Sequence, residues 1–164
     1  MKRLTSLCLA LAGLLLSSHR AEAAPIKACD FMTVQTAASV FGATVGAGRE
    51  ETLPMASQQC IFAHDNPASP GEITFGLSEV NAMAAAMGSN VASITRIVKS
   101  TVETNAETIP SLGEWNAYGW NGLTDYTLTV IYHGKVLTLG SSGSKNPNLK
   151  AAIVQAMRQI MQKL

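Results

Sequence analysis

The sequence predicts an α+β domain built on a single antiparallel sheet of about five strands, with helices packed on one face of that sheet. Segments in which apolar residues alternate come in two groups, and turn residues separate the members of each group. Segments with helical periodicity precede, separate and follow these groups. The predicted order is therefore helix, two strands, helix, three strands, helix.

The first 23 residues have the organisation of a secretory signal peptide. Lys2 and Arg3 form a basic start, residues 4–16 are apolar, and Ala21-Glu22-Ala23 matches a cleavage site. The apolar run is short for a bilayer span, and no later run reaches the roughly 20 apolar residues that a spanning helix needs. We therefore expect an exported protein, periplasmic or secreted, in which residues 24–164 form one domain without a transmembrane segment.

Cleavage of this leader also changes the charge. It removes three basic residues and one acidic residue, so the formal net charge passes from +1 to −1. The remaining basic residues form no cluster. Because nucleic-acid binding needs several clustered cations to displace counterions, the sequence predicts no nucleic-acid partner and no anionic membrane surface as a partner.

Two cysteines, Cys29 and Cys60, remain after cleavage. Exported proteins with two cysteines usually pair them. We predict a disulfide that closes a loop of about 30 residues. The loss of chain entropy in the unfolded state would then stabilise the fold by roughly 3 to 4 kcal/mol. The alternative is a pair of reactive thiols or metal ligands, which the long spacing and the lack of an accompanying histidine pair disfavour.

Residues 33–41 predict the first helix. Their apolar residues recur at helical spacing on one face. Asp30 or Thr33 can cap the start, and Gly42 stands where a helix commonly ends. The predicted disulfide would fasten this helix to the segment that contains Cys60.

A loop and a hairpin are expected next. Residues 46–54 are polar and rich in glycine, which indicates a loop, with a short extended piece at Thr44-Val45. Residues 57–64 and 72–77 alternate and are separated by strong turn signals, so they predict a hairpin with a longer loop.

The segment from residue 80 to about residue 101 has a helical pattern that Gly88-Ser89-Asn90 interrupts. One kinked helix and two short helices both fit this pattern. The β-branched run over 94–102 also fits a strand. A connector over 105–113 follows.

Residues 114–140 predict three antiparallel strands joined by two tight turns. Asn121-Gly122 suits a two-residue type I′ turn, because both of its central positions need positive φ. That turn places Tyr118 opposite Asp125. His133-Gly134 predicts the second turn. Since side chains alternate along a strand, this register assigns every residue of the three strands to one of two faces.

The two predicted faces differ in character. The core face carries Trp115, Ala117, Leu128, Val130, Leu137 and Leu139. The other face is mixed and carries Asn116, Tyr118, Trp120, Leu123, Thr127, Thr129, Ile131, Val136 and Thr138. A shift of one residue in the register would exchange these faces.

The last helix has the clearest pattern in the chain. An apolar stripe runs from Leu149 to Leu164, opposite a polar face. Asn146 is expected to cap this helix, and Pro147 to occupy its first position, where a missing N–H costs nothing.

Several of these motifs together resemble a known group of proteins. They are Cys29, Phe41-Gly42, Cys60-Ile61-Phe62, Leu112-Gly113-Glu114 with Tyr118, and a C-terminal helix that ends at Leu164. In these the chain resembles small exported α+β domains of unknown function found in actinobacterial cell-envelope lipoproteins and kinase sensor ectodomains. The resemblance implies a binding or sensing module rather than an enzyme. The chain lacks the lipid-attachment cysteine of that group, so membrane tethering does not carry over.

Residues that commonly carry catalysis form no recognised motif. His64 and His133 fall at predicted strand ends or turns, and His64-Asp65 would need Asp30 or Glu72 to complete a small metal site. Neither a nucleophile elbow nor a P-loop occurs. The carboxylates are scattered, and the sequence selects no glycosidase-like pair from them. We predict no catalytic residue, metal or cofactor.

The mixed face of the predicted meander is the remaining candidate for function, because it sets large apolar groups beside threonines. The predicted binding residues are Tyr118, Trp120, Leu123, Ile131 and Val136. If a helix or the loop at 50–56 covers this face, these residues form a second core layer instead.

The function expected from the sequence is therefore that of an exported, non-enzymatic domain that binds or senses a protein or small-molecule ligand. The alternative is a periplasmic or cell-envelope hydrolase, or an inhibitor of one. In that alternative, His64, Asp65 and nearby carboxylates would lie in a cleft.

Overall fold

The computed structural model describes residues 26–55, 57–66, 68, 70–101, 106–119 and 126–164. In chain order, the elements are η1 (Ala28–Asp30), α1 (Val34–Phe41), β1 (Arg49–Leu53), β2 (Ser57–Ala63), β3 (Glu72–Glu79), α2 (Val80–Ala86), α3 (Val91–Thr101), β4 (Trp115–Gly119), β5 (Tyr126–Tyr132), β6 (Lys135–Ser142) and α4 (Leu149–Met161). The predicted signal peptide lies outside the described residues. Within the described part, no helix is long and apolar enough to cross a membrane.

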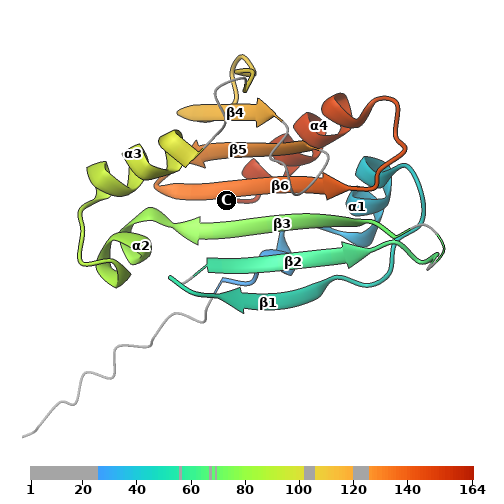
Figure 1. The fold of residues 1–164 in the computed structure, drawn as a ribbon, viewed down its shortest axis with the longest axis horizontal. Coiled ribbons are helices and arrows are strands. Elements are labelled where there is room, and N and C mark those ends of the chain that lie inside the picture. Colours follow the sequence, from blue (N-terminus) through green and yellow to red (C-terminus); the bar gives the residue numbers. More distant parts are fainter. Residues whose placement is uncertain (1–25, 56, 67, 69, 102–105, 120–125) are drawn as a thin grey trace, which may run out of the picture.

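The described strands form one open antiparallel sheet of six strands, in the order β1-β2-β3-β6-β5-β4 (Figure 1). Each half of the sheet is a meander of three strands that follow one another in sequence. The halves join where β3 pairs antiparallel with β6, from Glu72 opposite Ser142 to Glu79 opposite Lys135. The α+β class and the single antiparallel sheet are thus confirmed, with six strands in place of about five.

The predicted packing of all helices on one face is wrong, because helices cover both faces. One core contains α1 and α4 together with Leu128, Leu137 and Leu139 of the sheet. A smaller core contains α2 and α3 together with Ile131 and Val136, which alternate to the other face. In Figure 1, α2 and α3 lie at one end of the sheet and α1 toward the other.

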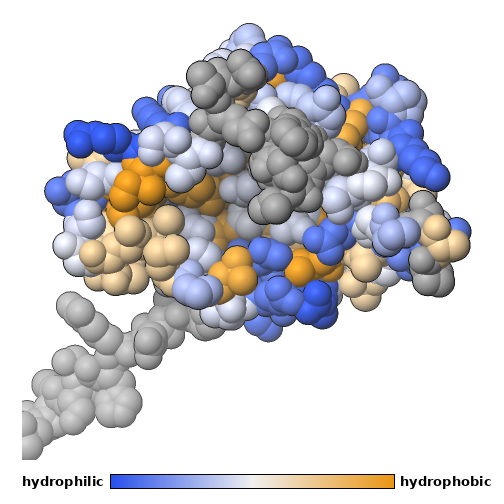
Figure 2. Space-filling view, in the orientation of Figure 1, coloured by the Kyte–Doolittle hydropathy of each residue, from blue (hydrophilic) through white to orange (hydrophobic). Residues whose placement is uncertain are grey.

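Not all of the apolar surface of α2 and α3 enters this smaller core. Figure 2 shows apolar side chains gathered at this end of the molecule. Met87, Val91 and Ile97 are among the exposed large apolar residues there. Isolated apolar groups are normal on a protein surface, so these residues do not by themselves indicate a site.

The segment predicted as a loop over 46–54 contains the edge strand β1. Its residues are mostly polar, as is common for edge strands, where charge discourages pairing with other chains. Glu50 pairs with Cys60 of β2, and its carboxylate accepts hydrogen bonds from the backbone N–H groups of Ala28 and Cys29 at 2.7 and 2.8 Å. A polar strand of this kind has no alternating apolar signal, which explains why the sequence pattern missed it.

The disulfide between Cys29 and Cys60 is confirmed, with a Cα–Cα distance of 5.0 Å. It joins the segment that precedes α1 to β2. Gly48 passes close to it, since a Cβ built there would lie 2.8 Å from the sulfur of Cys60. The bond therefore sits within a tightly packed corner of the larger core.

The predicted register of the first hairpin of the C-terminal meander is wrong. Tyr118 pairs with Leu128, not with Asp125, which is a shift of three residues. Because the shift is odd, β4 presents its opposite face. Asn116 and Tyr118 lie on the larger core, and Trp115 packs against the smaller one. The predicted Asn121-Gly122 turn lies outside the described residues.

The second hairpin of this meander has the predicted register, with Val130 opposite Leu137 and Leu128 opposite Leu139. The turn takes positive φ at both His133 and Gly134, with values of 48° and 71°. This is the conformation that a two-residue primed turn requires.

The helices follow the predictions with small changes. Thr33 caps α1 by accepting from Thr36 N–H, and Gly42 ends it at a φ of 81°. The segment from 80 to 101 forms two helices, so the strand alternative is wrong for its described part. The last helix begins at Leu149 rather than at Pro147.

Candidate functional site

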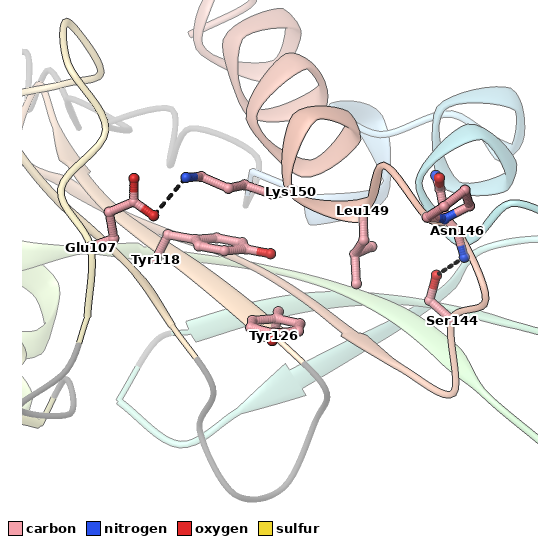
Figure 3. A pocket seen from close by; sticks show the side chains of 8 residues that line it. Glu107, Tyr118, Tyr126, Ser144, Asn146, Leu149 and Lys150 are labelled. Carbon is pink, nitrogen blue, oxygen red and sulfur yellow. Dashed lines mark hydrogen bonds and ion pairs between the residues drawn. The ribbon is translucent and has the colours of Figure 1, made fainter.

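A pocket of about 770 Å³ opens between the β4–β5 edge of the sheet and the start of α4 (Figure 3). It lies on the side of the larger core. The described lining residues are Glu107, Tyr118, Tyr126, Ser144, Asn146, Pro147, Leu149 and Lys150. We call it the tyrosine pocket. Its size is that of a small-molecule site.

Two stacked tyrosines form its aromatic wall. The rings of Tyr118 and Tyr126 are nearly parallel, at 4°, with their centroids 5.4 Å apart. Tyr118 pairs with Leu128, and Tyr126 lies two residues from Leu128 on the same strand, so the tyrosines are diagonal neighbours on one face. Tyr118 is 7% exposed and Tyr126 is 43% exposed, so the inner ring supports the outer one.

An ion pair closes the pocket beside these rings. The Nζ atom of Lys150 lies 2.6 Å from Oε2 of Glu107 and 5.8 Å from the centroid of the Tyr118 ring. The second distance is within reach of a cation–π attraction. Figure 3 shows the Lys150 side chain extending from α4 across Tyr118 toward Glu107. The pair therefore ties α4 to the segment before β4.

Glu107 is fixed in place by its own backbone. Its N–H donates to the carbonyl of Tyr118 at 2.7 Å, and the N–H of Tyr118 donates back to its carbonyl at 2.8 Å. This isolated antiparallel bridge extends the pairing beyond the β4 edge. The Glu107 side chain consequently has a defined origin next to the Tyr118 ring.

A buried amide supports the same segment. Asn116 accepts a hydrogen bond from the N–H of Ile109 at 2.7 Å, and its Nδ2 donates to the carbonyls of Ile109 and Leu112. All three bonds are buried. They hold the connector between α3 and β4 against the larger core, and so help to position Glu107.

The opposite side of the pocket joins α4 to α1. The Asn146 amide donates to the carbonyls of Ser39 and Val40, and its Oδ1 accepts from Asn148 N–H. Ser144 donates to the carbonyl of Phe41. These polar groups already have partners within the fold, so they shape the pocket. Lys150 and Glu107 are the charged residues of its described lining.

The hydroxyl of Tyr118 stays protonated at neutral pH. Burial first, and then the charges of Tyr126 and Glu107, raise the pKa of Tyr118 from 10.0 to about 12. The group can therefore donate a hydrogen bond, but it cannot act as a general base near neutral pH.

The predicted binding surface is not assembled as expected. Ile131 and Val136 are buried in the smaller core beneath α2 and α3, and Tyr118 lies on the other side of the sheet. Trp120 and Leu123 lie outside the described residues. Of the five predicted residues, Tyr118 is one that lines a pocket.

Sequence reasoning missed Glu107, Tyr126 and Lys150. Tyr126 shares a face with Leu128 through simple alternation, and a correct register would have joined it to Tyr118. Lys150 lies 43 residues from Glu107, and nothing in the local sequence of either residue indicates the pair.

A second pocket, of about 410 Å³, lies near the turn between β2 and β3. Its described lining includes His64, Glu72 and Ser142. Glu72 and Ser142 are directly opposed across β3 and β6, and the ring of His64 lies 4.9 Å from that of Phe41. Asp65, predicted to act with His64, does not appear among the described residues of this lining.

Potential metal ligands meet elsewhere. Among the described residues, the group of three that can reach one ion is Cys29, Glu50 and Cys60. Both of its sulfurs are joined in the disulfide. The metal site considered for His64-Asp65 with Asp30 or Glu72 is not among such groups in the described part of the chain.

Comparison with protein-family models, with curated proteins and with solved structures finds no match to this chain. The resemblance to exported sensor and lipoprotein domains therefore stays a prediction.

Proposed function

We propose that the chain is an exported, non-enzymatic domain that binds a small ligand in the tyrosine pocket. One observation carries the proposal: in one concave site, an exposed tyrosine ring stacks on a second ring, and a lysine–glutamate pair lies beside that second ring. Binding sites typically combine an apolar or aromatic surface with a few placed polar groups.

The same residues favour binding over catalysis. Lys150 and Glu107 are paired with each other, and the pKa of Tyr118, at about 12, is far from neutral. The described lining of this pocket contains neither histidine nor cysteine. General acid–base or nucleophilic catalysis relies on such groups being poised near the working pH.

Export is supported by the disulfide between Cys29 and Cys60. Disulfides persist in oxidising compartments and are rare in reducing ones. The sequence pattern of residues 1–23 supports the same compartment. The ligand would then come from the periplasm, the cell surface or the medium.

The proposal is tested by thermal unfolding in small-molecule fractions extracted from the cell envelope. A ligand at 100 times its dissociation constant stabilises a protein by about 2.7 kcal/mol, which raises Tm measurably. We expect one or more fractions to raise the Tm of the wild type but not that of Tyr126→Ala.

The matched control is Ile97→Ala. Ile97 is 42% exposed, close to the 43% of Tyr126, but it lies on α3 and does not appear in the described lining. This variant should respond to the same fractions as the wild type. An equal response of Tyr126→Ala would contradict the proposed site, and no response of the wild type to any fraction would contradict the function.

A hydrolase is the second candidate, favoured by the presence of Ser142, His64 and Glu72 around one pocket. A serine, a base and a carboxylate are the components of nucleophilic hydrolysis. The test is hydrolysis of chromogenic esters by the wild type and Ser142→Ala. Esterase activity that is present in the wild type and lost in Ser142→Ala would support the hydrolase. Equal esterase activity in the two proteins would contradict it.

A further inference from the structure

We infer that the ligand of the tyrosine pocket is an uncharged saccharide, an inference that rests on the proposed function. A sugar ring carries C–H groups on its faces and hydroxyl groups around its edge. The pocket offers a counterpart to each, in the exposed ring of Tyr126 and in a charged pair that lies beside the neighbouring ring of Tyr118 (Figure 3).

The aromatic surface is the outer ring of the stack. Tyr126 is 43% exposed and lines the pocket, while the parallel ring of Tyr118 lies behind it. Tyrosine supplies contact area at a low cost in conformational entropy, since it has two side-chain torsions. The stacking restrains them further, so the apolar face of a ligand meets a surface that is already ordered.

The charged pair favours a neutral ligand. Lys150 and Glu107 are the charged residues in the described lining, and their formal charges cancel. An anionic or cationic ligand would compete with an ion pair whose atoms are 2.6 Å apart. A neutral polar ligand can add to this pair without separating it.

Adjacent hydroxyl groups suit such a pair. An ammonium group has three donors and a carboxylate has about four acceptor positions, so both keep capacity after bonding each other. One hydroxyl of a ligand can accept from Lys150 while its neighbour donates to Glu107. The protonated hydroxyl of Tyr118 offers a further donor at the other end of its ring, toward Leu149 (Figure 3).

The other side of the pocket adds apolar contact. Leu149 and Pro147 line it, and Figure 3 shows the Leu149 side chain across the pocket from the tyrosines. The polar groups of Asn146 and Ser144 are bonded within the fold. A ligand would thus contact apolar surface on two sides of the pocket and form hydrogen bonds at Lys150 and Glu107.

The test is an NMR titration of the protein purified after export, with its disulfide intact. The probes are neutral trisaccharides with glucose or N-acetylglucosamine units, galacturonic acid, 4-hydroxyphenylacetate and a neutral dipeptide. We expect a neutral saccharide to shift the backbone amides of Tyr118, Tyr126 and Lys150 saturably, and the other probes to leave them unchanged.

Variants separate stacking from hydrogen bonding. Tyr126→Phe keeps the ring and should bind within about threefold of the wild type, whereas Tyr126→Ala should bind about tenfold more weakly. Lys150→Met should weaken binding by about tenfold through the lost charged donor. Lys99→Met is its control, because the Lys99 ammonium likewise lies 5.8 Å from an aromatic centroid, that of Trp115, outside the described lining of the pocket.

The outcomes distinguish this inference from the function on which it rests. If the aromatic acid, the uronic acid or the dipeptide shifts these amides and no neutral saccharide does, the inferred ligand class is wrong. The chain would then still be a binding domain. Saccharide binding that is unchanged in Tyr126→Ala overturns its placement. If no probe binds, the inference fails, and the envelope-fraction experiment alone decides the proposed function.

Discussion

The Asn116 side chain forms hydrogen bonds with both the N–H and the carbonyl of Ile109, at 2.7 and 2.9 Å. A neighbouring strand would satisfy these two backbone groups in the same way. A third bond reaches the carbonyl of Leu112. The sheet edge at β4 is thereby joined to the connector that carries Glu107. Together with the backbone bridge between Glu107 and Tyr118, these bonds position Glu107 at the tyrosine pocket.

Replacing Asn116 with alanine should therefore destabilise the fold. Three buried backbone groups would lose their partners, and a buried polar group without a partner costs about 1 to 3 kcal/mol. We expect the free energy of unfolding to fall by about 3 kcal/mol, measured by urea denaturation.

Asn148→Ala is the control for this change. Asn148 precedes α4, and its side chain makes no capping hydrogen bond there. Asn148→Ala should lower the free energy of unfolding by no more than about 0.5 kcal/mol, as is usual for surface substitutions. Equal losses in the two variants would show that the Asn116 bonds do not stabilise the connector.

Gly113 should tolerate no side chain. It has a φ of 68°, and a Cβ there would lie 2.5 Å from Cγ1 of Val130 and 2.6 Å from the carbonyl oxygen of Ile131. Gly113→Ala must displace the β5 backbone as well as adopt a left-handed conformation. We expect a loss of about 3 kcal/mol or more in thermal or urea unfolding.

Gly88 separates these two effects. It has a similar φ of 58°, but nothing lies within 4 Å of a Cβ built there. Gly88→Ala should therefore cost about 1 kcal/mol, the expense of the left-handed conformation alone. A Gly113→Ala variant as stable as Gly88→Ala would contradict the close packing against β5.

The disulfide should stabilise the protein through its loop. Cys29 and Cys60 are 31 residues apart, for which the chain-entropy estimate is about 3 to 4 kcal/mol. Cys29→Ser with Cys60→Ser should lose about that amount in urea unfolding. Intact mass should differ by two hydrogens between the oxidised and reduced wild type, and identical masses would contradict the bond.

Some of this architecture could be predicted from the sequence because its signals are local. Thr33 and Gly42 mark the ends of α1 through their own backbone preferences. His133-Gly134 sets the register of β5 and β6 in the same way. The cysteine pair follows from the count of cysteines in an exported chain.

The remainder depends on contacts between distant residues. β1 is a polar edge strand, so its sequence has no apolar alternation to detect. The register of β4 was inferred from Asn121-Gly122 as a two-residue turn, but the strands pair as Gly119 with Thr127, farther apart than such a turn spans. This error reversed the predicted faces of β4, so Tyr118 was not placed on the face of Leu128.

The candidate site was correspondingly harder to predict than the fold. Its charged pair joins a connector residue to a residue of α4, and neither has a recognisable motif around it. The assembly of the pocket requires the correct β4 register and the position of α4 together. Among the described residues of the predicted surface, Tyr118 is the one that also belongs to this pocket.

Alkaline pH should weaken the fold through Tyr118. Its pKa is about 12 in the folded protein, against an ordinary value of 10.0, mainly because burial disfavours the phenolate. Above pH 10 the unfolded chain loses this proton while the folded chain keeps it, so the unfolded state binds fewer protons. The stabilisation is fully present below pH 10 and is lost as pH rises toward 12.

Tyr118→Phe removes this ionisation and retains the ring that stacks on Tyr126. We expect the free energy of unfolding of the variant to fall less steeply than that of the wild type between about pH 10 and pH 12, measured by urea denaturation at each pH. Parallel pH profiles for Tyr118→Phe and the wild type would show that the Tyr118 hydroxyl ionises as readily in the folded protein as in the unfolded chain.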